Sequence, residues 1–115
     1  MDDLTEMLKG VLEGCVLQIL HHRESYGYEI VKALNQAGFE SVADGTVYPI
    51  LIRLEKKHLV DVARVRSEMG PPRKVYTLNN AGVHALTGFW ERWEFVASRL
   101  ESIKNDKHNK EDRDG

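Results

Sequence analysis

Basic side chains are concentrated between Arg53 and Lys74, and they are the residues of this chain best suited to do chemistry. The segment holds seven basic and only three acidic residues, a net charge of +4, whereas the rest of the chain holds nine basic and fifteen acidic residues, a net charge of −6. A cationic segment on an acidic body attracts polyanions to that segment alone, and nucleic-acid phosphates are the commonest such partner. The alternative to nucleic-acid binding is that the segment forms a solvated face that is basic by chance. The position of the segment in the fold decides between these two interpretations.

Other kinds of chemistry find little support in the residue pattern. Cys15 and His22 are seven residues apart, and His21 is adjacent, but no HxxxH or CxxC pair is present, so we expect no metal site and no cofactor. The chain also has no nucleophile–base–acid set, no P-loop and no glycine-rich dinucleotide turn, so we do not expect an enzyme. Cys15 is predicted to be a small core residue rather than a redox centre.

Length and composition predict one small globular domain. The chain has 115 residues, of which 42% are hydrophobic and 30% charged. No apolar run approaches the roughly 20 residues of a membrane span, so no membrane partner is expected. The start of the chain carries Asp2, Asp3 and Glu6 instead of a basic stretch before an apolar one, unlike a signal peptide. We therefore expect the protein in the cytoplasm.

Apolar spacing predicts three helices in the first half of the chain. One uninterrupted stripe runs from Leu4 to Leu20. A second helix, capped by Ser25, ends at Gly38. The third has a face made of Val47, Ile50, Leu51 and Leu54. Its Pro49 is best tolerated in a first turn, so we expect Thr46 as the capping residue and an end near Lys57.

A hairpin and one more helix follow. Residues 59–66 and 74–78 are rich in valine and tyrosine and are predicted strands, joined by a turn at Gly70-Pro71-Pro72. The last helix begins near Asn79 or Asn80, and its apolar residues are spaced three and four apart, as in a heptad seam that packs on a partner helix or subunit. Residues 105–115 have no apolar side chain and are expected to be disordered.

The order α-α-α-β-β-α is that of a winged helix-turn-helix, so the fold class is mainly α with a small β-hairpin. We expect a winged helix-turn-helix DNA-binding domain at 1–78, a long C-terminal dimerisation helix at 79–104 and a tail at 105–115. The basic segment then coincides with the recognition helix and the wing. Burial of the apolar face of the third helix turns Thr46, Pro49, Arg53 and Lys56 outward, with Tyr48 at the flank.

Double-stranded DNA is the partner that these residues favour. Arginine can bond bidentately to guanine in the major groove, while lysine, tyrosine and threonine more often contact phosphates. A winged-helix module that binds protein without DNA is the alternative. Its signature would be an apolar, uncharged third helix and wing, the reverse of what this chain has.

Three runs also resemble the PadR family of bacterial transcriptional regulators, over residues 5–104. They are Ser25-Tyr26-Gly27-Tyr28-Glu29-Ile30, the stretch from Asp44 to Glu55 with its Gly-Thr-x-Tyr-Pro-x-Leu-x-Arg-Leu-Glu pattern, and Arg73-Lys74-Val75-Tyr76-Thr77-Leu78. The resemblance implies a dimeric repressor whose first and last helices build the dimer interface. It places Thr46, Tyr48, Pro49 and Arg53 against DNA, with Arg73 and Lys74 on the wing. The chain departs from the family at His58, where glycine is usual, so a left-handed helix end would cost roughly 1 kcal/mol.

Three sets of candidate residues result. A homodimer would present two recognition helices to an inverted repeat. A small aromatic effector that relieves repression could bind beside Trp93, as family members do with planar drugs or phenolic acids, although packing at the interface is an alternative role for this residue. The expected DNA-binding residues are Tyr26, Thr46, Tyr48, Pro49, Arg53, Lys56, Arg64, Arg66, Arg73 and Lys74; the expected dimer residues are Leu8, Leu12, Leu86, Phe89, Trp93, Val96, Leu100 and Ile103; and the expected effector residues are Trp90, Trp93 and Cys15.

Overall fold

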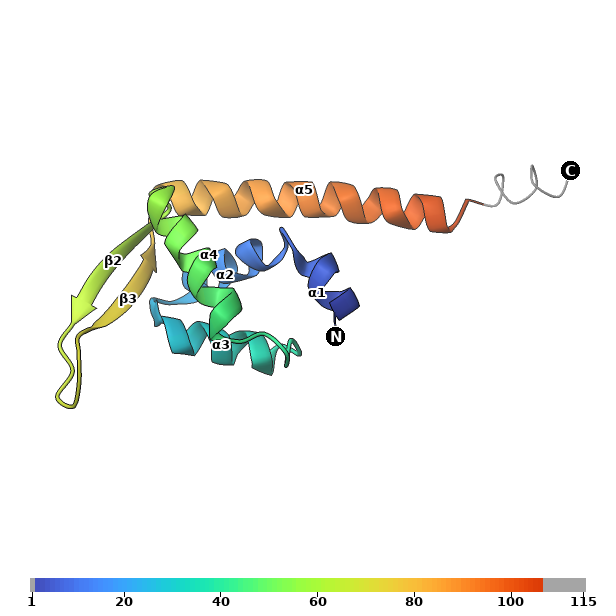
Figure 1. Ribbon diagram of the computed structural model, residues 1–115. Helices are drawn as coiled ribbons and strands as arrows, with labels where there is room; N and C mark the ends of the chain where they lie inside the picture. The colour runs from blue at the N-terminus through green and yellow to red at the C-terminus, as the bar shows by residue number, and fades with distance from the viewer. Residues whose placement is uncertain (1, 107–115) are drawn as a thin grey trace, which may run out of the picture.

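The computed structural model describes residues 2–106, which form five helices and three strands (Figure 1). In chain order these are α1 Asp2–Leu8, α2 Leu12–His22, β1 Ser25–Tyr26, α3 Gly27–Gln36, α4 Asp44–Lys56, β2 Val60–Val65, β3 Arg73–Leu78 and α5 Asn80–Lys104. The predicted class, mainly helical with a small sheet and a long C-terminal helix, is confirmed. Most of the predicted tail, residues 107–115, lies outside the described residues.

The first predicted helix is divided in two, so the expectation of an uninterrupted helix from Leu4 to Leu20 was wrong. Gly10 has a φ of 84°, in the left-handed region, and it separates α1 from α2. The amide of Val11 donates to the carbonyl of Leu8 at 2.9 Å and closes the turn. Leu8 and Leu12 are both buried on either side of the break. The apolar spacing therefore continues across Gly10 although the helix does not.

Ser25 does not cap the second predicted helix, which is a further correction. It lies in β1, is 2% exposed, and its hydroxyl donates to the carbonyl of Arg23 at 3.1 Å. Tyr26 is the N-cap of α3, and its backbone N–H donates to Oε1 of Glu29 at 2.8 Å. This is the glutamate half of a capping box.

The sheet has three antiparallel strands in the order β1-β3-β2, one more than the predicted hairpin. In the hairpin Arg64 pairs with Lys74 and Val65 with Arg73. On the other side of β3, Ser25 pairs with Tyr76. The central strand thus ties the hairpin to the start of α3, so the hairpin is held at both its base and one edge.

The third predicted helix, α4, begins at Asp44 with Ala43 as its N-cap, three residues before the predicted cap, Thr46. The amides of Thr46 and Val47 both donate to the carbonyl of Ala43, at 3.0 and 3.2 Å. Pro49 consequently lies inside the helix instead of in its first turn. Because proline has no N–H, the carbonyl of Gly45 lacks its helical hydrogen-bond donor. Gly45 is exposed, so water can donate to that carbonyl instead.

α4 ends in a left-handed turn at His58, whose φ is 58°, so histidine here adopts the conformation that glycine adopts most easily. The amide of Leu59 donates to the carbonyl of Leu54 at 3.0 Å and that of His58 to Glu55 at 3.0 Å, the two bonds of a Schellman motif. Asn79 supports the turn by donating from Nδ2 to the carbonyl of His58 at 2.9 Å. Its Oδ1 accepts from the amide of Gly82, so Asn79 also caps α5, which begins within the predicted range of Asn79 or Asn80.

The core lies between α2, α3, α4 and the first part of α5. Its most deeply buried side chains, Val16, Ile30, Leu51 and Leu54, have no exposed surface. α2 and α5 approach closely, since a Cβ on Gly14 would overlap the ring of Phe89. Beyond that contact α5 continues past α1, away from the body (Figure 1). Among residues 2–106, no helix is long and apolar enough to cross a membrane.

Candidate nucleic-acid interface

The outward side of α4 carries the side chains that the sequence placed there. Val47, Ile50, Leu51 and Leu54 are at most 5% exposed, and they fix which side of the helix faces the core. The five residues predicted to face outward or flank that side are all exposed: Thr46, Tyr48, Pro49, Arg53 and Lys56. This side of α4 is therefore free for a partner, within the part of the chain that the structure describes.

The outermost line of the helix differs from the predicted one. Positions i, i+4, i+7 and i+11 share one side of a helix, and the line opposite the buried residues consists of Gly45, Pro49, Ile52 and Lys56, all exposed. We call these four residues the outer stripe. Thr46 and Arg53 lie at its edge toward α2, where both line a cavity of about 290 Å³ together with Glu13. Ile52, which is 53% exposed, is a member of the interface that sequence reasoning missed.

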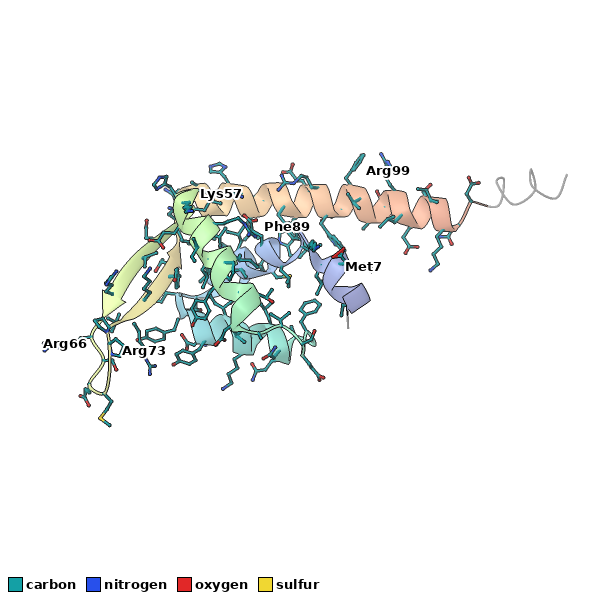
Figure 2. The ribbon with its side chains drawn as sticks, viewed as in Figure 1. Met7, Lys57, Arg66, Arg73, Phe89 and Arg99 are labelled. Carbon is teal, nitrogen blue, oxygen red and sulfur yellow. The ribbon has the colours of Figure 1, made fainter. Side chains whose placement is uncertain are left out.

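The hairpin adds four exposed cations. Arg64, Arg66, Arg73 and Lys74 all have exposed side chains. Figure 2 shows Arg66 and Arg73 near the tip, on opposite sides of the hairpin, with Arg73 directed toward the side where α3 lies. With Arg53 and Lys56 of α4, these residues form what we call the basic surface. α4 and the hairpin thus both expose positive charges.

A groove lined by tyrosines lies between α4, β3 and the start of α3. Its volume is about 360 Å³, and we call it the tyrosine groove; its aromatic and cationic lining residues are Tyr26, Tyr28, Tyr48, Tyr76, Arg73 and Lys74. The rings of Tyr26 and Tyr28 stack at 5.7 Å with 9° between their planes, and the Arg73 guanidinium lies 5.5 Å from the centre of the Tyr28 ring. The groove therefore joins phenol hydroxyls to cations, the combination that contacts DNA phosphates and sugars.

Two details fix the tyrosines of this groove. A Cβ on Gly27 would come within 2.6 Å of the Tyr48 ring, so glycine is required for the ring to lie against the start of α3. Burial, with smaller contributions from Glu55 and Tyr48, raises the pKa of the Tyr76 phenol. Tyr76 therefore stays protonated and remains a hydrogen-bond donor. Tyr28, which is 49% exposed, was not among the predicted site residues, although the Tyr-Gly-Tyr run signalled it.

Some cations of the basic surface have carboxylate partners within the chain. Arg53 lies 3.9 Å from Glu13, and Lys74 lies 3.8 Å from Glu55. Both pairs are long, and their cations are exposed to solvent, so each contributes at most about 1 kcal/mol. Among the side chains that the structure describes, Lys56, Arg64, Arg66 and Arg73 form no ion pair. Most of the positive charge is therefore available to an external anion.

The predicted dimer residues divide into a buried and an exposed group. Leu8, Leu12 and Leu86 are at most 8% exposed and belong to the core of the chain itself, and Phe89 packs on α2 beside Gly14. These residues offer little surface to a partner. The remaining four become steadily more exposed along α5, from 42% for Trp93 and 47% for Val96 to 58% for Leu100 and 70% for Ile103.

The predicted effector residues lie on α2 and α5. Trp90 is held in place because its Nε1 donates to Oε1 of Gln18 at 2.8 Å and its ring meets that of Phe89 edge-on at 5.0 Å. Trp93 is 42% exposed. Cys15 is partly buried against the core, and this burial raises the pKa of its thiol. Among the described residues no group of three or more His, Cys, Asp or Glu side chains could hold a metal ion.

Comparison with known proteins agrees with this geometry. The transcriptional regulator PadR-like family matches residues 16–88. A Streptococcus transcriptional regulator of known structure is 42% identical, with a TM-score of 0.76, over 86% of this chain and 97% of the other. A PadR-like transcriptional regulator from Bacillus cereus is 38% identical, with a TM-score of 0.76, over 89% of this chain and 99% of the other. Transcriptional regulator YqjI of Escherichia coli is 28% identical over 81% of this chain, which spans 44% of the length of YqjI.

Proposed function

Because the chain belongs to the PadR-like family of transcriptional regulators, we propose that it is a repressor that binds an inverted-repeat operator as a homodimer. The observation that carries this proposal is the basic surface, which α4 and the hairpin expose together. It occupies the two elements of a winged helix-turn-helix that contact DNA. A protein-binding module would not need this concentration of unpaired cations.

The arrangement supports a division of roles between the two elements. α4 enters the major groove, where Arg53 can reach a guanine edge and Lys56 a phosphate. Tyr26, Tyr48 and the cations Arg73 and Lys74 line the tyrosine groove and are placed to bind one phosphate strand beside α4. Arg64 and Arg66 extend the contact along the neighbouring backbone. Thr46 and Pro49 lie in the first turns of α4, where that helix would enter the groove.

A second copy of the chain is the partner that best fits the exposed part of α5. Trp93, Val96, Leu100 and Ile103 keep a spacing of three and four residues and leave 42–70% of their surface to solvent. Such a stripe is self-complementary when two copies are related by a two-fold axis. The same axis would relate two α4 helices, and helices about one turn of DNA apart in this symmetry would read an inverted repeat.

Trp93 is also the best-placed residue for a small aromatic effector. It is exposed on the stripe that we assign to the dimer, whereas Trp90 is tied to Gln18. An apolar space between two copies of Trp93 would accept a flat ring by stacking. Cys15 on α2 would line the same region. We propose that occupation of this space changes the angle between the two DNA-binding domains and so relieves repression.

Selection of bound duplexes from random DNA tests the proposed function. We expect the selected sequences to share an inverted repeat with half-sites about one helical turn apart. Arg53→Ala should weaken binding to the selected duplex by about 1–3 kcal/mol, because the contact is to a base. Arg99→Ala is the matched control, since Arg99 is exposed on α5 over the Phe95 ring and away from the basic surface. Enrichment of no sequence would overturn the proposal.

A further inference from the structure

Ile52 is a large apolar side chain in the middle of the outer stripe. It is 53% exposed, whereas the other aliphatic residues of α4 from Val47 to Leu54 are at most 5% exposed. Ile52 is not a core residue: its exposed side chain lines the tyrosine groove at the edge of α4 that faces β3. Its neighbours along the stripe, one turn away on either side, are Pro49 and Lys56, and both are exposed.

The outer stripe has little hydrogen-bonding capacity where it would face the bases. Gly45 has no side chain, and Pro49 and Ile52 have no polar side-chain atom; only Lys56, at the end of the stripe, can donate. A Cβ on Gly45 would have no neighbour within 4 Å, so the space around the start of the helix is open. Base edges could therefore come close to Ile52, but this part of α4 cannot read them by hydrogen bonds.

The floor of the major groove offers few groups that isoleucine can contact favourably. Placed on a phosphate or on a polar base edge, an isoleucine would displace water and return no hydrogen bond, which costs free energy. The 5-methyl group of thymine is the one apolar group on the standard base pairs there. We propose that Ile52 reads a thymine methyl group in each half-site of the operator. This inference rests on the proposed function and adds the base that the stripe selects.

Replacement of thymine by deoxyuridine tests the inference, because it removes the methyl group and changes nothing else. Each thymine of the selected operator is replaced in turn, symmetrically in both half-sites, and the dissociation constant is measured by fluorescence anisotropy. At one symmetric pair we expect wild-type affinity to fall about 4-fold per methyl group, hence about 15-fold in total. The Ile52→Ala variant should bind the thymine and uracil duplexes equally.

Two controls separate the possible failures. Lys56→Ala should weaken binding to both duplexes and leave the thymine-to-uracil ratio at its wild-type value, since its contact is to phosphate. Because Ile52 is exposed, Ile52→Ala should keep the wild-type circular dichroism spectrum. If the wild type binds its operator tightly but is indifferent to every uracil replacement, or if Ile52→Ala keeps the wild-type ratio, the inference is wrong and the proposed function stands. If no duplex is selected at all, the proposed function itself fails.

Discussion

The guanidinium of Arg53 on α4 lies 3.9 Å from the carboxylate of Glu13 on α2. The same carboxylate accepts a hydrogen bond from Nζ of Lys57 at 3.0 Å. Glu13 is only 23% exposed, so it is the more fixed member of both pairs. Glu13 therefore pairs with Arg53 of α4 and with Lys57, the C-cap of that helix, and competes with any external anion that would bind them.

Glu13→Gln should therefore increase affinity for DNA. Arg53 would no longer give up an ion pair on binding. Pairs of this kind are worth about 0.2–1 kcal/mol each, and the dimer has two, so we expect a dissociation constant about 2- to 30-fold lower. Fluorescence anisotropy with the operator measures the change. Glu91→Gln, which removes an exposed carboxylate of α5, is the control for net charge. An equal effect of both substitutions would show that the pair itself has no role.

Gly10→Ala should destabilise the chain at the break between α1 and α2. Its φ of 84° lies in the left-handed region, where a Cβ costs about 1–2 kcal/mol. A Cβ there would meet no atom within 4 Å, so crowding does not contribute. Chemical denaturation gives the free energy of unfolding. Gly10→Asn should lose less, because asparagine tolerates this conformation better than alanine, and equal losses for the two variants would contradict the explanation.

Leu100→Glu should disrupt the proposed dimer. Leu100 is 58% exposed in the single chain, so the substitution does not disturb the core. In the dimer it would bury a charge, and the dissociation constant of the dimer should rise about 100-fold or more. Light scattering coupled to gel filtration reports the mass. Ser98→Glu adds the same charge at a nearby exposed position that lies off the apolar spacing, and it should leave the dimer intact. A Leu100→Glu protein that still elutes as the wild type would count against this interface.

Trp93 should report an aromatic effector through its fluorescence. Titration with a phenolic carboxylic acid and with a planar cationic dye should quench the emission if a ring stacks on Trp93. Trp93→Ala should lose this quenching, whereas Trp90→Phe should retain it, because Trp90 is held by Gln18. Quenching that survives in Trp93→Ala would assign Trp93 to packing alone.

The sequence predicted the elements that depend on local spacing. The apolar face of α4, the hairpin and the start of α5 near Asn79 or Asn80 follow from periodicity, β-branched content and capping preferences, and each was found in the structure. Ile52 was missed, although a large apolar residue on the otherwise polar side of an amphipathic helix itself indicates a binding role. The break at Gly10 was missed because the apolar residues keep their spacing on both sides of it.

The remaining differences involve residues that are far apart in the chain. β1 is two residues long and forms because Ser25 pairs with Tyr76, about fifty residues later. The contacts of Glu13 with Arg53 and Lys57 likewise join α2 to α4. Local sequence patterns do not indicate pairings between residues that are far apart in the chain. The carboxylate partners of the basic surface could therefore be identified only from the structure.

The salt dependence of DNA binding tests the central claim, binding through the basic surface, most directly. If each protomer neutralises about three or four phosphates, the plot of log K against log salt should have a slope of about −5 to −7 for the dimer. Replacing Arg64 and Arg66 together by alanine removes two exposed cations per protomer and should make the slope shallower by about 2–4. A slope near zero, or one that this double substitution leaves unchanged, would contradict DNA binding by α4 and the hairpin.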